Sequence, residues 1–244
     1  MHEESRWGAL RSPSEVRAMF DRIAPRYDLL NRVMSWGQDV QWRKQAAALV
    51  ALQPRGEAPV LDLATGTGDL ALALAQAGVD RIVGVDFSLG MLRRARQKCS
   101  QQPAIHLVCG DAMHLPFPSG TFAACTIAFG LRNLPDYPAA VQEMARVLRP
   151  GGLLVVLETT PVRRGGFGHL FRWYFGWLVP FVGGLLSGNR DAYTYLPRST
   201  AAFLDVPQLV RVMSQAGLRV EYAAQLMRGT VALIAARRIS APRC

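Results

Sequence analysis

The chain has 244 residues, of which half are hydrophobic, and its formal net charge is +10 at pH 7. This length and apolar content suit one domain with a sizeable core, and the positive charge favours anionic surfaces. The four cysteines have no C-x-x-C spacing, which argues against a metal site or a disulfide framework. No secretory signal is visible at the amino terminus, so we expect a cytoplasmic protein with free thiols.

In chain order, residues 1–14 lack periodicity and are expected to be disordered, and apolar residues at helical spacing then predict a helical cap over 15–52. Strands and helices alternate from residue 59. Strands are expected at 59–64, 81–86, 104–109, 122–128 and 152–158, and helices at 69–77, 88–99 and 136–148. This alternation predicts an α/β fold with a doubly wound, mostly parallel sheet. Residues 161–206 read as an insertion before a helix at 207–216 and strands near 218–225 and 230–236. The whole chain, 1–244, is expected to form a single domain.

The first predicted strand runs into a turn that contains two glycines, Gly66 and Gly68, and then into an alanine- and leucine-rich helix. Glycines at these positions let the backbone bend sharply and let a ligand approach main-chain N–H groups. Asp86 ends the next strand, where a carboxylate accepts hydrogen bonds from ribose hydroxyls. The two features together predict a cofactor that contains adenosine.

The glycine turn alone does not select the cofactor, because it also satisfies the dinucleotide fingerprint of NAD enzymes. A further acid, Asp111, ends the third strand and can meet an adenine amino group. With Asp62 or Asp69 near a cationic sulfonium, acids line the whole cofactor path. This arrangement suits S-adenosylmethionine, which has no phosphates, better than a pyrophosphate. For Asp62 a second interpretation stays open, in which it is a buried acid that caps backbone N–H groups.

Four segments resemble the signatures of one group of class I methyltransferases, the C-methyltransferases of ubiquinone and menaquinone biosynthesis. The matching segments are 27–31, 129–134, 146–152 followed by Glu158, and 191–196, and the resemblance extends over residues 18–236. Three positions depart from the pattern of this family. Asp39 stands where histidine is usual, and Ala128 and Thr160 stand where serine is usual.

The resemblance implies methylation of a ring carbon of a polyprenylated quinol by S-adenosylmethionine. Demethylmenaquinol is the first candidate substrate, and 2-polyprenyl-6-methoxy-1,4-benzoquinol, from ubiquinone synthesis, is the alternative. The cofactor contacts that the resemblance implies are Thr67, Asp86, Asp111 and Ala112.

Such a reaction requires a means of stabilising a phenolate, and Arg132 is the first candidate because it follows a strand whose carboxyl end faces the cofactor crevice. Asn133 is expected to hold a water beside it. In the alternative interpretation Arg132 pairs with an acid such as Asp136 and only fixes a loop. Four further residues are acceptor-pocket candidates that packing alone would also explain: Tyr27, Asp28, Tyr193 and Tyr195.

Residues 167–186 are rich in aromatic and aliphatic side chains, and arginines flank them. We interpret this stretch as an apolar path for an isoprenoid tail, with peripheral attachment to the anionic inner face of a membrane. A lid or a subunit contact is the alternative, which keeps a homodimer open. No clustered basic helix indicates nucleic acid. Two rival functions remain at this point: an NAD-dependent oxidoreductase, and a non-catalytic basic binding protein on a methyltransferase fold.

Overall fold

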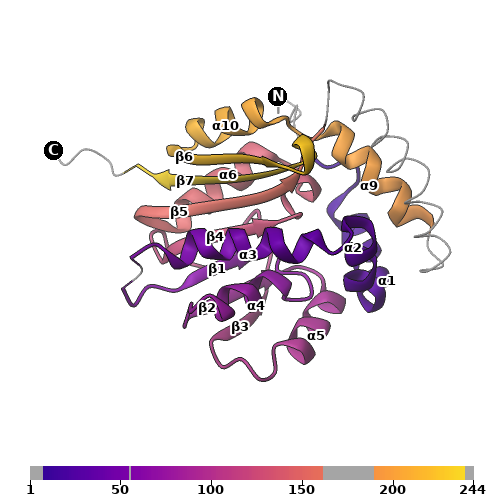
Figure 1. Ribbon diagram of the computed structural model, residues 1–244, viewed down its shortest axis with the longest axis horizontal. Coiled ribbons are helices and arrows are strands. Elements are labelled where there is room, and N and C mark those ends of the chain that lie inside the picture. Colours follow the sequence, from indigo (N-terminus) through magenta and orange to yellow (C-terminus); the bar gives the residue numbers. More distant parts are fainter. Residues whose placement is uncertain (1–7, 55, 162–189, 240–244) are drawn as a thin grey trace.

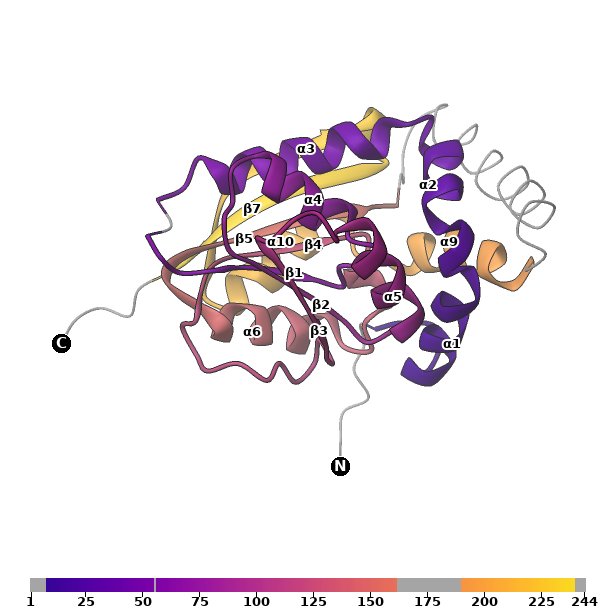
Figure 2. The ribbon, with the colours of Figure 1, turned by 90° about the horizontal axis from the view of Figure 1, so that it is seen from below.

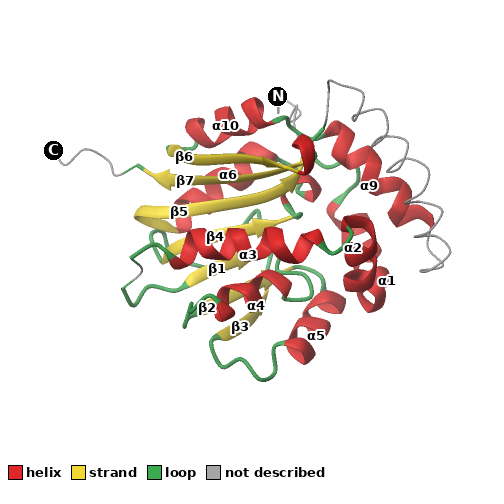
Figure 3. Ribbon diagram, in the orientation of Figure 1, coloured by secondary structure: helices red, strands yellow, loops and turns green. Residues whose placement is uncertain are grey.

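The computed structural model describes residues 8–54, 56–161 and 190–239, and these form a seven-stranded sheet between two layers of helices (Figures 1 and 3). The strand order is β3-β2-β1-β4-β5-β7-β6. The strands are β1 Val60–Leu63, β2 Ile82–Asp86, β3 Ile105–Cys109, β4 Phe122–Ala128, β5 Leu148–Thr159, β6 Leu218–Leu226 and β7 Val231–Arg238. Strands β1 to β5 are parallel, and β7 runs antiparallel to both β5 and β6. The predicted doubly wound α/β fold is therefore confirmed.

Helices α3 Gln38–Ala51, α4 Asp69–Gln76 and α5 Leu89–Lys98 lie on one face of the sheet, and α6 Tyr137–Val147 and α10 Val206–Gln215 lie on the other (Figure 2). The chain reverses its winding direction between β1 and β4. In doubly wound sheets the crevice outside the carboxyl ends of the strands at this point is where ligands bind.

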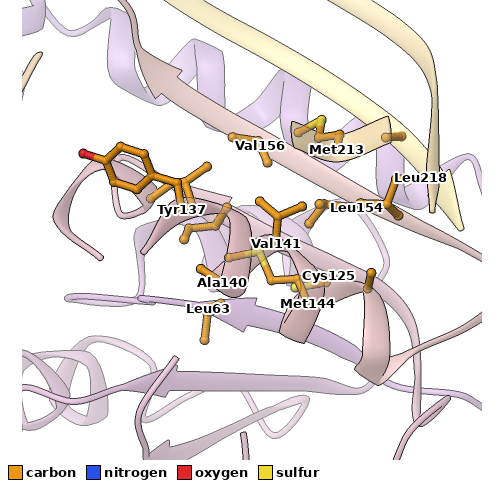
Figure 4. Close-up of a cluster of buried hydrophobic side chains, with 14 of the residues drawn as sticks. Leu63, Cys125, Tyr137, Ala140, Val141, Met144, Leu154, Val156, Met213 and Leu218 are labelled. Atoms are coloured by element: carbon orange, nitrogen blue, oxygen red, sulfur yellow. The ribbon is translucent and has the colours of Figure 1, made fainter. Parts of the chain in front are cut away.

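The core under α6 shows why the layers hold together. Tyr137, Val141 and Met144 project from α6 onto Leu154 and Val156 of β5 (Figure 4). All of them are at most 1% exposed. Burial of a large apolar side chain contributes about 1.5–3 kcal/mol, so this face anchors the strands whose ends carry the site.

A helical cap, formed by α1 Pro13–Ile23, the 3₁₀ turn η1 Ala24–Arg26 and α2 Tyr27–Ser35, lies at the carboxyl ends of the strands. Ser12 and Glu15 form a capping box that starts α1, so residues 13 and 14 belong to a helix and not to a disordered tail. The cap is tied to α5 because Asp21 Oδ1 accepts hydrogen bonds from Ser88 Oγ at 2.6 Å and from Gly90 N at 2.9 Å. Helix α3, predicted as part of the cap, instead packs on the face of the sheet.

The described part of the predicted insertion contains α9 Arg190–Ala202, which packs beside the cap through Tyr195. Two short 3₁₀ turns, η2 Leu131–Asn133 and η4 Met227–Gly229, follow β4 and β6. The apolar stretch 167–186 lies outside the described residues. Within residues 8–54, 56–161 and 190–239, none of the helices has both the length and the hydropathy that crossing a membrane requires.

Candidate active site

The glycine turn between β1 and α4 has the tight geometry that the sequence predicts. Gly68 has φ +85°, and a Cβ there would lie 2.7 Å from Cys99 Sγ, so both conformation and space require glycine. The N–H of Gly66 donates to Asp86 Oδ2 at 2.8 Å. The turn and the end of β2 are thus joined by a direct hydrogen bond.

Asp86 is a buried acid that faces a cavity. Its Oδ1 accepts a second backbone hydrogen bond, from Ser88 N at 2.9 Å, and only 6% of the residue is exposed. Burial raises the pKa of Asp86 to about 6, although the backbone N–H groups favour its ionised form. A ligand that donates hydrogen bonds or carries positive charge would stabilise the carboxylate.

The cofactor cavity, as we call the space beside Asp86, has a volume of about 340 Å³ and lies at the carboxyl ends of β1, β2, β3 and β4. This volume falls in the usual range of small-molecule sites. Four of the predicted cofactor residues line it: Gly66, Asp86, Asp111 and Ala112. The Asp111 side chain is exposed, and its Oδ1 accepts from Met113 N at 2.9 Å, whereas Ala112 is buried.

Three other predicted cofactor residues, Asp62, Thr67 and Gly68, are not among the cavity-lining residues. Asp62 is 1% exposed and accepts hydrogen bonds from Thr65 Oγ1 at 2.6 Å and Thr126 Oγ1 at 2.9 Å. The burial predicted by its alternative interpretation is therefore observed, but its partners are hydroxyls and not backbone N–H groups. Burial raises the pKa of Asp62 to about 6 as well.

Thr67 and Asp28 bind each other instead of facing a cavity. Thr67 Oγ1 donates to Asp28 Oδ1 at 2.5 Å, and Lys98 Nζ donates to Thr67 Oγ1 at 3.0 Å and also pairs with Asp28. The structure thus places Asp28, a predicted acceptor-pocket residue, in a contact that joins the cap to the glycine turn.

A second cavity, the acceptor cavity, lies between the cap, α3, α9 and η2 and has a volume of about 100 Å³. Most of its wall is apolar, with Met19, Leu30, Met34 and Trp42 among the lining residues. It also contains four residues that the sequence predicts for catalysis or acceptor binding: Tyr27, Arg132, Asn133 and Tyr195. The side chain of the remaining candidate, Tyr193, lies outside the described part of the chain.

Arg132 is 5% exposed and pairs with Glu158, which is fully buried at the end of β5. The ion pair with an acid that the alternative interpretation predicts is therefore present, but the acid is Glu158 and not Asp136. Asp136 caps α6 instead, where its Oδ1 accepts from Ala139 N at 2.9 Å. Glu158 is the partner because β4 and β5 are neighbouring strands of the sheet. The turn after Ala128 therefore lies beside Glu158.

The carbonyl of Phe129 also holds the two candidate catalytic residues. It accepts hydrogen bonds from Arg132 Nη1 at 3.0 Å and from Asn133 Nδ2 at 3.2 Å. Phe129 has φ +58°, a left-handed backbone conformation that residues other than glycine rarely adopt. Backbone strain of this kind concentrates at functional sites. Its ring packs against Trp42 and beneath the Arg43 guanidinium.

Three buried polar atoms in the described part of the chain have no hydrogen-bond partner: Arg132 Nε, Asn133 Oδ1 and Tyr195 Oη. All three belong to residues that line the acceptor cavity. An unpartnered buried donor or acceptor costs about 1–3 kcal/mol, which a polar ligand would recover. The acceptor cavity thus has a mostly apolar wall, and three of its lining residues each carry a buried polar atom without a hydrogen-bond partner.

The two cavities share part of their walls. Phe20, Tyr27, Phe129 and Asn133 line both. Burial raises the pKa of the Tyr27 hydroxyl, so this side chain stays neutral at neutral pH. The arrangement brings a ligand in one cavity next to a ligand in the other, as a group transfer requires.

A network of charges connects the cap to the two helices beside the glycine turn. Asp39, which is 2% exposed, pairs with Arg32 and with Arg43, whose Nη1 lies 2.5 Å away, and its Oδ1 accepts from Ser35 Oγ at 2.9 Å. Asp69 at the start of α4 then contacts Arg32, at 3.2 Å. Asp39 stands where the resembling family usually has histidine, and two arginines thus compensate its negative charge.

Sequence reasoning did not assign roles to Glu158 or Phe129. Glu158 carries a signal that would have found it, because it is an acid directly after an apolar strand, as Asp86 is. The role of Phe129 rests on its carbonyl and its left-handed backbone, which no side-chain pattern reveals.

Comparison with known proteins agrees with this geometry. Residues 9–238 match the model of the ubiE/COQ5 methyltransferase family. The chain is 50% identical over 206 residues to a demethylmenaquinone methyltransferase of Thermus thermophilus, which covers 84% of this chain and 93% of that protein. It is 43% identical over 227 residues to a protein of the same name from a Mycobacterium species, over 93% of this chain and 95% of that one.

Solved structures with low sequence identity share the fold. The [4+2]-cyclase SpnF matches with a TM-score of 0.68 at 19% identity, over 96% of this chain and all of that one. A geranyl diphosphate methyltransferase in complex with GPP and sinefungin matches with a TM-score of 0.59 at 17% identity, over 80% of this chain and 77% of that one. These structures support the fold alone. The family match, together with relatives at this identity over most of the chain, shows that the chain belongs to the ubiE/COQ5 methyltransferase family.

Proposed function

We propose that this methyltransferase uses S-adenosylmethionine to methylate a ring carbon of demethylmenaquinol. The observation that carries the proposal is the pair of adjoining cavities, one beside a buried acid and one apolar with three unpartnered polar atoms. The names of the relatives favour a demethylated menaquinone as the acceptor.

The cofactor cavity fits S-adenosylmethionine. When bound, this cofactor supplies a methyl group that its positive sulfur already activates. Asp86 would accept hydrogen bonds from the ribose hydroxyls, since its carboxylate is buried at the end of β2 and lines the cavity. Gly66 leaves the turn open to close approach, and Asp111 and Ala112 lie farther along the same wall, where the adenine would bind.

The wall of the acceptor cavity matches the chemistry of a quinol, which carries two hydroxyl groups on an otherwise apolar ring. Asn133 Oδ1 would accept a hydrogen bond from one hydroxyl, and Arg132 Nε–H would donate to the oxygen as negative charge develops on it. Phenolate character, gained as the hydroxyl proton passes to water, would raise electron density at the ring carbon that receives the methyl group. That carbon would then lose its own proton to water. Glu158 holds the Arg132 guanidinium in place, so we assign Glu158 a positioning role.

The experiment that tests this proposal measures transfer of a labelled methyl group to chemically reduced demethylmenaquinone. We expect transfer to the reduced naphthoquinol but not to the oxidised quinone, because only the quinol can supply a phenolate. The methoxy-benzoquinol of ubiquinone synthesis serves as the competing acceptor. Preferential methylation of the benzoquinol would replace the proposed substrate, and transfer to neither quinol would refute the proposed reaction.

A matched pair of variants tests the acceptor cavity. Tyr195→Phe removes a hydroxyl that has no partner, so the protein should be at least as stable, while kcat/KM for the quinol falls about tenfold or more. Tyr137→Phe is the control, because Tyr137 Oη donates to the Arg132 carbonyl at 3.2 Å and does not line the cavity. It should lower the unfolding free energy by about 1 kcal/mol with little change in quinol KM. The opposite pattern would remove Tyr195 from the site.

A further inference from the structure

One face of α2 exposes large apolar side chains to solvent. Leu29, Val33 and Trp36 are 56%, 43% and 77% exposed, and their spacing places them along one side of the helix. Leu30 and Met34, each one residue further along, point about 100° around the helix and line the acceptor cavity. The same short helix therefore separates the cavity from an apolar surface.

Trp36 occupies a backbone position that disfavours a tryptophan. It is the C-cap of α2 with φ +55°, in the left-handed region where glycine is the usual residue. A residue other than glycine is strained in this conformation, and the Trp36 side chain remains mostly exposed to solvent. Packing against the described residues does not explain a tryptophan at this place, whereas contact with an apolar surface does.

Positive charge adjoins this apolar surface. Arg22 near the end of α1 and Arg26 in η1 are exposed, and both precede Leu29 closely in the chain. Figure 2 shows α1 and α2 following each other along one side of the molecule. Arginine beside exposed leucine, valine and tryptophan is the composition of surfaces that bind an anionic bilayer, where tryptophan prefers the interface.

We propose that the docking face, formed by Arg22, Arg26, Leu29, Val33 and Trp36, seats on the surface of an anionic lipid bilayer. The orientation places the acceptor cavity, on another side of α2, next to the membrane that dissolves a polyprenylated quinol. The part of this inference that concerns the quinol rests on the proposed function. The apolar side chains enter the headgroup region, and the arginines contact lipid phosphates.

Flotation of the purified protein with lipid vesicles tests the docking face. Trp36→Gly should weaken binding to anionic vesicles about tenfold or more, because it removes the largest inserted side chain. The same substitution should leave the unfolding temperature unchanged or raise it, because glycine suits the left-handed C-cap. Arg22→Gln should weaken binding about fivefold, and purely zwitterionic vesicles should bind the wild type weakly.

Leu52→Ser provides the matched control. Leu52 is 79% exposed like Trp36 but lies at the far end of α3, away from the cap. Its vesicle binding should equal that of the wild type. Equal vesicle binding by the wild type and Trp36→Gly would overturn the proposal. So would sedimentation that finds the wild type dimeric and Trp36→Gly monomeric, because the face would then be a subunit contact.

A second readout separates this inference from the proposed reaction. Methylation of a short-chain, water-soluble quinol should be unchanged in Trp36→Gly, while methylation of a long-chain quinol held in vesicles should fall in parallel with binding. Loss of vesicle binding in a protein that methylates no quinol would retain the docking face and refute the proposed substrate. If Trp36→Gly no longer bound vesicles but still methylated the vesicle-held quinol at the full rate, the docking face alone would be overturned.

Discussion

Affinity for S-adenosylmethionine should depend on pH through Asp86. Burial raises the pKa of this carboxyl from 3.8 to about 6, so it takes up a proton in the folded, ligand-free protein as the pH falls through about 6. The ionised carboxylate accepts stronger hydrogen bonds from ribose hydroxyls than the protonated acid does. Binding should therefore weaken on the acidic side of this pKa.

The magnitude follows from the titration. A group with a pKa of about 6 is about nine-tenths ionised at about pH 7 and about one-tenth ionised at about pH 5, so the dissociation constant should rise about tenfold, or about 1.4 kcal/mol. Stability of the ligand-free fold changes in the opposite sense. The folded state binds the proton more tightly than the unfolded state, so this group's contribution to stability is complete below the ordinary pKa of 3.8 and is lost as the pH rises through about 6.

Calorimetric titration with the cofactor across this interval provides the assay, with two aspartate variants as controls. Asp86→Asn should bind about tenfold more weakly at neutral pH and lose the pH dependence. Asp62→Asn should keep it, because Asp62 has a similarly raised pKa but does not line the cofactor cavity. A wild-type affinity that is flat between about pH 7 and about pH 5 would refute the assignment of Asp86, as would an equal slope in Asp86→Asn.

The remaining predictions concern the packing and charge of the site. Gly130→Ala should lower the unfolding free energy by about 1–3 kcal/mol, because its Cβ would lie 2.6 Å from the Ala64 Cβ, and adding Ala64→Gly should restore stability in denaturant unfolding. Asp39→Ala should cost about 2 kcal/mol by leaving its two arginine partners without their shared carboxylate, and an unchanged midpoint would contradict this. Glu158→Gln should destabilise the protein by about 3 kcal/mol, whereas Glu158→Gln with Arg132→Met should fold better and still fail in methyl transfer.

Much of the cofactor cavity could be predicted from the sequence because its signals are local. An apolar strand that ends in glycines or an acid marks its own carboxyl end, and the parallel topology brings such ends to one edge of the sheet. Gly66, Asp86 and Asp111 are identified in this way, and all three line the cavity.

Contacts that depend on strand register could not be read from the chain. Thr126 faces Asp62 because β1 and β4 are neighbours, and Glu158 meets Arg132 because β5 follows β4 in the sheet. Asp28 was predicted for the acceptor pocket next to Tyr27, but successive residues of a helix point in different directions. The turn of α2 directs Asp28 to Lys98 while Tyr27 lines the cavity.

The shared wall of the two cavities has a consequence for inhibitor design. Phe20, Tyr27, Phe129 and Asn133 border both spaces, so an adenosyl group and a quinol head group can be parts of one molecule with a short linker. Joining the two parts makes the second binding event intramolecular, at an effective concentration in the millimolar range. Such a bisubstrate compound would gain selectivity over other enzymes that use the same cofactor, because its second half needs an apolar cavity that adjoins the cofactor cavity.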